Sequence, residues 1–149
     1  MARTPIYSKW SLRTPIADPA TVFSVVADVE RYCEFMPGVG ARILRRDGPR
    51  WEVENTFGVG PLNTRFVSLA EVRPPSELTI VSNDGPCRAY STHWLVTPDE
   101  AGCVLECETK IEFRSLALDI VARVWFERGE RAVMAAFDRR LKSFEGSGR

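Results

Sequence analysis

Apolar residues near the end of the chain recur every three or four positions between Leu116 and Phe144. This spacing predicts one amphipathic helix of about eight turns, with an apolar side that must be covered. Ser115 is placed to cap the start of this helix and Gly146 to end it. The positions expected on the covered side are Leu118, Val121, Trp125, Gly129, Ala132, Val133, Ala136, Phe137, Leu141 and Phe144.

Charged residues of alternating sign occupy another side of the same helix. They are Asp119, Arg123, Glu127 and Arg131, each four residues from the next. Pairs at this spacing contribute a few tenths of a kcal/mol each and are typical of a solvent-exposed face. We therefore expect the helix to lie on a surface with its charged side in water.

Gly129 interrupts this helix on or beside its apolar side. Glycine inside a helix costs about 1 kcal/mol relative to alanine, so its presence needs a reason. One interpretation is close packing of the helix on a sheet, and the other is space left for a ligand beneath the helix. The sequence leaves both interpretations open.

The N-terminal part of the chain predicts one strand followed by two short helices. Polar and apolar residues alternate from Ile6 to Arg13, which indicates a strand with one more apolar face. Asp18-Pro19 predicts a helix start, with the aspartate as N-cap. A second helical segment, Val29 to Phe35, ends at Met36-Pro37-Gly38, because proline disfavours helical geometry in the residue before it.

From Ala41 onward, strand-like runs are separated by turn signals at fairly even intervals. The Asp47-Gly48 pair between two such runs predicts a hairpin. The expected strands are Arg42 to Arg46, Trp51 to Val59, Leu62 to Val72, Glu77 to Ser82, Arg88 to Val96 and Cys103 to Phe113.

This order of elements predicts a single α+β domain over residues 1–149, with residues 146–149 as a flexible tail. We expect an antiparallel sheet of about seven strands that curves around the long C-terminal helix. Because a curved sheet and a helix do not close on each other fully, a cavity for a hydrophobic ligand is expected between them.

Alternation along the strands also predicts which side chains face that cavity. Asn55, Tyr90 and Thr92 are the polar members of the inward set. Either they bond to one another, to the backbone or to water, or they orient the polar head of a ligand. The full inward set is Trp51, Val53, Asn55, Phe57, Tyr90, Thr92, Trp94, Val96, Leu105, Cys107, Thr109, Ile111 and Phe113. The positions between them, expected in solvent, include Glu52, Glu54, Glu106, Glu108, Lys110 and Glu112.

Composition narrows the class of protein. Lys plus Arg and Asp plus Glu number 20 each, so no net charge draws the whole chain to nucleic acid or to an anionic bilayer. The four cysteines lack a CxxC spacing and the N-terminus shows no secretory signal, so we expect reduced thiols in a cytoplasmic protein. No apolar run reaches the roughly 18 residues that suggest a membrane span.

Catalytic features are sparse. The inward positions hold almost no ionisable groups, whereas acid/base catalysis needs such groups in a cleft. His93 is the single histidine, and its alternation with Trp94 predicts that it points outward. No cysteine or serine has the surroundings of an activated nucleophile, and no zinc ligand set is present. These observations favour a binding protein over an enzyme.

Two parts of the sequence together resemble a known family. Residues 27–37, ADVERYCEFMP, resemble the D-V-E-x-Y-x-x-F-x-P signature of the coenzyme-Q-binding START-like proteins. Bacterial members of that family include the ribosome-association toxin and polyketide cyclase/dehydrase-like chains. Further segments of this chain resemble the last strands and the long helix of that family. They are Gly85-Pro86 with Trp94, Phe113-Arg114-Ser115, Phe126-Glu127-Arg128 and Ala136-Phe137-Asp138-Arg139-Arg140.

The resemblance implies a helix-grip (START/Bet v 1-like) fold with a hydrophobic tunnel between the long helix and the sheet. It also implies binding of ubiquinone or a similar isoprenoid lipid without chemical transformation, as a carrier or chaperone that requires no other cofactor. One departure leaves the ligand open: this chain has Pro37-Gly38-Val39 where many relatives have Pro-Trp followed by Cys. The expected ligand-binding residues are Phe35, Met36, Asn55, Phe57, Phe66, Tyr90, Thr92, Trp94, Cys107, Thr109, Val121, Trp125, Gly129 and Val133.

Two alternatives remain. The first is a ribosome- or partner-binding protein like the toxin, using a basic cluster of Arg42, Arg45, Arg46 and Arg50, although a solvated hairpin also explains that cluster. The second is a polyketide aromatase/cyclase that orients its substrate by cavity shape. No DNA partner is expected. A carrier would also visit the inner membrane peripherally, for which exposed apolar residues near Phe35, Met36 and Val39 are the expected contact.

Overall fold

The computed structural model describes residues 4–36, 38–59 and 62–145. Its elements confirm the predicted order of one strand, two short helices, six strands and one long helix. The predicted helix end at Gly146 and the tail at 146–149 lie outside the described residues. In chain order the elements are β1 (Ile6–Thr14), α1 (Pro19–Ala27), the 3-10 helix η1 (Val29–Glu34), β2 (Val39–Asp47), β3 (Arg50–Val59), β4 (Leu62–Arg73), β5 (Glu77–Ser82), β6 (Cys87–Asp99), β7 (Gly102–Phe113) and α2 (Leu116–Glu145).

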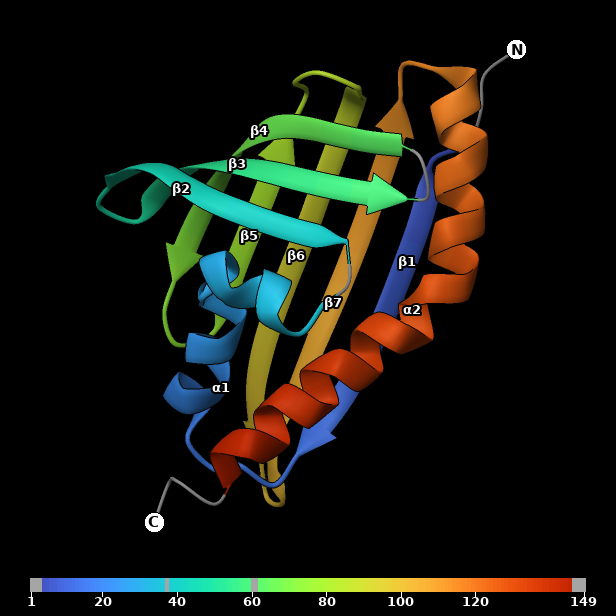
Figure 1. Ribbon diagram of the computed structural model, residues 1–149. Coiled ribbons are helices and arrows are strands. Elements are labelled where there is room, and N and C mark those ends of the chain that lie inside the picture. The colour runs from blue at the N-terminus through green and yellow to red at the C-terminus, as the bar shows by residue number, and fades with distance from the viewer. Residues whose placement is uncertain (1–3, 37, 60–61, 146–149) are drawn as a thin grey trace.

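The seven strands form one antiparallel sheet in the order β1-β7-β6-β5-β4-β3-β2. The β2–β3 hairpin turns at Gly48, whose φ of +58° is readily adopted by glycine, as the Asp47-Gly48 pair predicts. All helices lie on one face of the sheet, and α2 crosses that face diagonally (Figure 1). This is the predicted helix-grip architecture.

The two short helices cover one end of the sheet. The Asp18 side chain caps α1 by accepting a hydrogen bond from the Ala20 amide at 3.0 Å. Four side chains of α1 are buried, namely Val22, Phe23, Val25 and Val26. From η1, the Glu30 carboxylate accepts the amide of Ile43 at 3.1 Å, which satisfies a donor on edge strand β2.

Two hydrophobic clusters form the core. The larger one lies under α1, η1 and the C-terminal half of α2, where Trp10, Trp94 and Phe137 meet with ring centroids 4.8–5.9 Å apart. The smaller cluster lies near the start of α2 and contains Ile6, Phe66, Cys87, Ile111, Phe113 and Ala122.

The first half of α2 buries a different side from the one predicted. Asp119, expected in water, is only 4% exposed, and its carboxylate accepts a hydrogen bond from Arg123 at 2.9 Å. Arg123 also donates to the carbonyl of Thr4, just before β1. This ion pair and Ala122 pack where the helix contacts the sheet. The buried stripe of the first half of α2 is therefore shifted by about one residue, or 100° around the helix, relative to the predicted one. Ala132, predicted on the covered side, is exposed.

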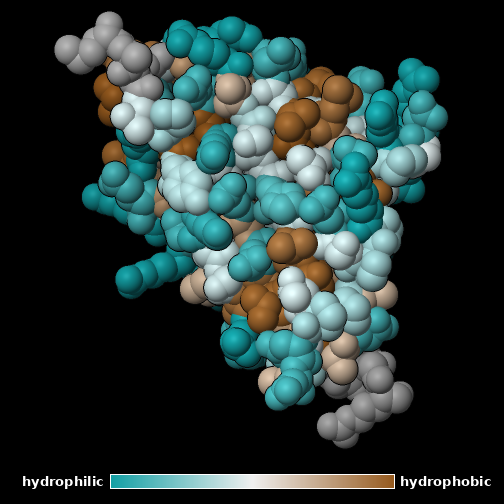
Figure 2. All heavy atoms as spheres, turned by 180° about the vertical axis from the view of Figure 1, so that it is seen from behind, coloured by the Kyte–Doolittle hydropathy of each residue, from teal (hydrophilic) through white to brown (hydrophobic). Residues whose placement is uncertain are grey.

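The outward side of the first half of α2 carries apolar side chains. Leu116, Ile120 and Val124 are each 45–59% exposed and follow one another at four-residue spacing. On the outer face of the sheet, which is mostly hydrophilic with separated apolar patches (Figure 2), the cross-strand pair Leu69 and Val81 is exposed as well. The helix itself bends about halfway along its length (Figure 1).

Candidate functional site

A cavity of about 180 Å³ lies between α2 and the sheet. Its wall includes members of both hydrophobic clusters, so the cavity separates the two parts of the core. Inward-facing side chains of all seven strands and of η1 and α2 contribute to it. The predicted cavity therefore exists in this structure.

The structure places most of the predicted ligand-binding residues on the cavity wall. These are Met36, Asn55, Phe57, Phe66, Tyr90, Thr92, Trp94, Cys107, Thr109, Trp125 and Val133. Phe35, Val121 and Gly129 are described but do not line the cavity. Whether the lining residues bind a ligand stays a prediction.

Packing explains why two of these three residues, Phe35 and Val121, lie off the wall. Phe35 packs edge to face on Phe137 at 5.1 Å and lies beneath the Arg140 guanidinium. It lines a separate surface groove of about 340 Å³ between the short helices and the end of α2, whose wall includes the charged residues Asp28, Arg31 and Arg140. Val121 falls beside the buried stripe because that stripe is shifted by one residue.

Gly129 fits neither of the two interpretations. A Cβ at this position would have as its nearest neighbours atoms of the Trp125 indole at 3.6–3.8 Å, which is ordinary van der Waals contact. Those atoms belong to the same helix, so close packing of helix on sheet does not explain the glycine. Since Gly129 is not on the cavity wall, ligand space does not explain it either.

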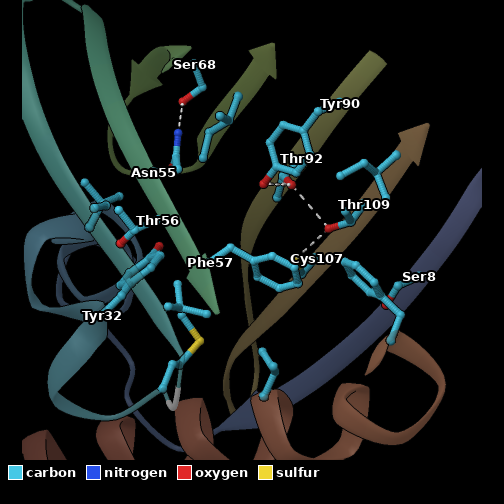
Figure 3. Close-up of a pocket in the computed structure, with 18 of the residues that line it drawn as sticks. Ser8, Tyr32, Asn55, Thr56, Phe57, Ser68, Tyr90, Thr92, Cys107 and Thr109 are labelled. Carbon is cyan, nitrogen blue, oxygen red and sulfur yellow. Dashed lines mark hydrogen bonds between the residues drawn. The ribbon is translucent and has the colours of Figure 1, made fainter. Parts of the chain in front are cut away.

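Two hydrogen-bonded polar groups lie on the mostly apolar wall (Figure 3). Ser8, Thr56, Thr64 and Glu130 are further polar residues of the wall. The first of the two groups is Asn55, whose amide nitrogen donates to Ser68 Oγ at 2.8 Å and to backbone carbonyls of β3 and β4. Ser68 is almost fully buried. This group is held by protein partners, as buried polar groups require.

The second polar group ends in a free donor. Thr92 donates to the Tyr90 hydroxyl at 2.7 Å and also lies 3.2 Å from the Thr109 hydroxyl. Because each hydroxyl has one hydrogen, Thr109 donates to Thr92 in this chain. The Tyr90 hydrogen has no acceptor among the described residues, and burial raises the pKa of Tyr90 to about 12, so this donor stays protonated. Tyr90 can thus donate to a ligand in the cavity.

The thiol and the second phenol on the wall are also neutral. Burial raises the pKa of Cys107 to about 12 and that of Tyr32 well above its ordinary value. The Tyr32 hydroxyl is used within the protein, because it donates to the carbonyl of Val26. A thiol held protonated is a poor nucleophile, so Cys107 is not equipped for covalent catalysis.

We place the mouth of the cavity between the end of β3 and the middle of α2. Thr56 there is the one exposed residue among the described wall residues, and Phe57, Trp125, Glu130 and Val133 are half-buried. The rings of Phe57 and Trp125 touch across this mouth. Met36, predicted to contact a bilayer, is only 6% exposed, so that prediction is wrong for this residue.

Several wall residues were missed by the sequence-based analysis. Ser8 and Ser68 follow the same alternation as their neighbours, and Ser8 pairs in register with Thr109, so the strand pattern could have identified them. Glu130 gave no such signal, because it lies one position beyond the expected apolar stripe. His93 lies on the outer face as predicted, with Nε2 3.0 Å from the Glu77 carboxylate.

Neither a metal site nor a membrane-spanning helix is found among the described residues. In residues 4–36, 38–59 and 62–145, no three His, Cys, Asp or Glu side chains gather as a metal site. Over the same ranges, no helix is both long enough and apolar enough to cross a membrane.

The family model for polyketide cyclase / dehydrase and lipid transport matches residues 16–138. The chain belongs to this family. Its match spans α1 through most of α2, and therefore the cavity wall except for the residues of β1. The family resemblance noted in the sequence is thereby confirmed.

The proteins similar to this chain include one named for ribosome association and one named for coenzyme Q binding. The chain is 28% identical over 127 residues to the ribosome association toxin RatA of Vibrio cholerae, covering 84% of this chain and 88% of RatA. It is 30% identical over 112 residues to the mitochondrial coenzyme Q-binding protein COQ10 of Drosophila melanogaster, covering 71% of this chain and 46% of COQ10. A START superfamily protein from Mycobacterium smegmatis has the same fold, with a TM-score of 0.68 at 14% identity over 92% of this chain and 99% of that one.

Proposed function

We propose that this protein binds ubiquinone or a similar isoprenoid lipid in the cavity beneath α2 and carries or shields it without transforming it. The observation that supports this most directly is the Tyr90 hydroxyl, a protonated donor on a mostly apolar wall that has no acceptor among the described residues. A quinone carbonyl is an acceptor that such a donor would orient. The similarity to COQ10 points to the same ligand class.

Cavity size suggests how the ligand lies. A dry apolar cavity of about 150 Å³ is enough for a benzene-sized ring, so 180 Å³ holds a ring but not a long isoprenoid tail. The ring would then occupy the interior near Tyr90, and the tail would leave through the mouth between Phe57 and Trp125.

Extraction and ligand titration test this proposal. Native mass spectrometry of the freshly purified protein, followed by organic extraction, should reveal a stoichiometric quinone or isoprenoid lipid. Tyr90→Phe should weaken binding of a short-tailed ubiquinone about 2- to 10-fold, because it removes one hydrogen bond. If neither the purified nor the reloaded protein holds a quinone, the proposal fails.

A carrier would have to collect its cargo from a membrane as a cytoplasmic protein that docks transiently. The exposed α2 residues Leu116, Ile120 and Val124 are suited to this contact. Replacing all three with serine should slow transfer of ubiquinone from vesicles, whereas Leu69→Ser/Val81→Ser on the outer sheet face should not. Equal transfer rates for both variants would argue against this contact.

Similarity to RatA supports a second candidate function, association with ribosomes. The hairpin arginines give it limited support, because Arg42 pairs with Glu54 at 3.6 Å and Arg46 stacks 4.7 Å from the Trp51 ring. Co-sedimentation with ribosomes at low salt would support this function, and its absence there would remove it. Among the described residues, the cavity wall offers Glu130 as its one carboxylate and no histidine, which gives a cyclase mechanism little support.

A further inference from the structure

The wall of the cavity carries one ionisable carboxylate and no cation. None of its described lining residues is Lys, Arg or His, and Glu130 is the sole Asp or Glu among them. Cavities that hold a carboxylate or phosphate ligand usually offer it an arginine or lysine partner. The charge pattern of this wall is the opposite.

The Glu130 carboxylate lies at the cavity and has no ion-pair partner. It is half-buried on α2 beside the mouth, and no described Lys, Arg or His forms a salt bridge with it. Its charge reaches the interior: burial is the main reason that the pKa of Cys107 rises to about 12, and the negative charge of Glu130 adds to that rise. Glu127, one turn earlier, is exposed instead.

We infer that Glu130 is a specificity-determining residue that excludes anionic amphiphiles from the cavity and so restricts its ligands to uncharged ones. A fatty acid or an acidic lipid head entering at the mouth would bring a second negative charge beside Glu130. Like charges in a partly desolvated site repel each other far more strongly than in water. An uncharged quinone or alcohol would not meet this barrier. This inference rests on the proposed binding of a hydrophobic ligand and narrows its chemical class.

The test compares two amphiphiles that share a tail, dodecanoate and 1-dodecanol, at about pH 8, where the carboxylic acid is ionised. Binding below the micellar range can be followed by tryptophan fluorescence, since Trp10, Trp94 and Trp125 line the cavity. A short-tailed ubiquinone is titrated in parallel. The measured quantity is the ratio of the two dissociation constants in the wild type, in Glu130→Gln and in the matched control Glu127→Gln.

The wild type should bind dodecanol about tenfold or more tightly than dodecanoate. Glu130→Gln should reduce that ratio about tenfold by improving dodecanoate binding, and Glu127→Gln should leave it unchanged. Equal binding of both amphiphiles by the wild type, or the same ratio in Glu130→Gln, would overturn the inference, and so would failure of both to bind.

The quinone titration separates this inference from the proposed function. Preference for dodecanol that depends on Glu130, without any quinone binding, would support the charge exclusion while refuting the quinone proposal. Quinone binding together with tight dodecanoate binding would support the quinone proposal and refute the charge exclusion.

Discussion

The indole ring of Trp125 on α2 meets the phenyl ring of Phe57 on β3 edge to face, with centroids 5.0 Å apart and planes at 82°. The two rings come from elements that lie on opposite sides of the cavity mouth. Trp125 also contacts Phe126 at 5.0 Å, so the aromatic contact continues along the helix. A ligand that enters or leaves between β3 and α2 must pass these rings.

Removing the indole should therefore speed ligand release. We expect Trp125→Ala to raise the dissociation rate of a short-tailed ubiquinone about tenfold, because one aromatic pair contributes about 0.5–1.5 kcal/mol beyond its buried area. Stopped-flow displacement measures this rate. Trp51→Ala, which changes a tryptophan off the cavity wall, is the control. An unchanged rate in Trp125→Ala would show that the mouth lies elsewhere.

Gly129 and Gly102 should respond oppositely to alanine. At Gly129 the new Cβ meets only ordinary contacts with Trp125, so the better helix propensity of alanine should raise the free energy of unfolding by about 0.5–1 kcal/mol. At Gly102, φ is +143° and the Cβ would overlap the carbonyl of Thr14, so a loss of about 2 kcal/mol or more is expected. Urea denaturation measures both. Destabilisation by Gly129→Ala would mean that the glycine serves the bend of α2.

Alkaline conditions should destabilise the protein. Burial raises the pKa of Cys87 to about 11 and that of Cys107 to about 12, against an ordinary value of 9.0. Above about pH 9 the unfolded thiols lose their protons while the folded ones keep them, so the free energy of unfolding falls as pH rises, by at most about 1.4 kcal/mol per pH unit for each thiol.

Denaturation between about pH 8 and pH 10.5 checks this dependence. Cys107→Ser should flatten the curve because it removes one titrating group, whereas Cys33→Ser should not, since Cys33 is exposed. A stability that stays constant over this range would contradict the expectation.

The buried ion pair on α2 should be sensitive to loss of its cation. Arg123→Ala leaves the Asp119 carboxylate, 4% exposed, without the guanidinium 2.9 Å away. We expect a loss of about 2 kcal/mol, less than for a fully buried pair because Arg123 is partly exposed. Arg131→Ala, at an exposed position, should cost little. The double variant Asp119→Ala/Arg123→Ala should recover part of the loss, and equal stability of the two single arginine variants would contradict this account.

The sequence by itself determined the secondary-structure elements and which strand residues face the cavity. Strand alternation is a local property with a period of two residues, so it placed Asn55, Phe57, Tyr90, Thr92 and Trp94 on the inward face correctly. The Asp18 cap and the turn at Gly48 were readable for the same reason, because each depends only on neighbouring residues. Some ends of the predicted strands, including both ends of Glu77–Ser82, coincide with the observed ones, and the others differ by one to three residues.

Tertiary structure decided which side of α2 faces the cavity. Each helical residue turns the side chain by about 100°, so stripes one residue apart are nearly equally plausible from spacing alone. Packing against β1, together with the Asp119–Arg123 pair, selected the stripe that buries Ala122 and leaves Leu116, Ile120 and Val124 outside. The same choice brought Glu130 to the cavity mouth. Its position there depends on contacts between residues more than a hundred positions apart along the chain, which local periodicity does not encode.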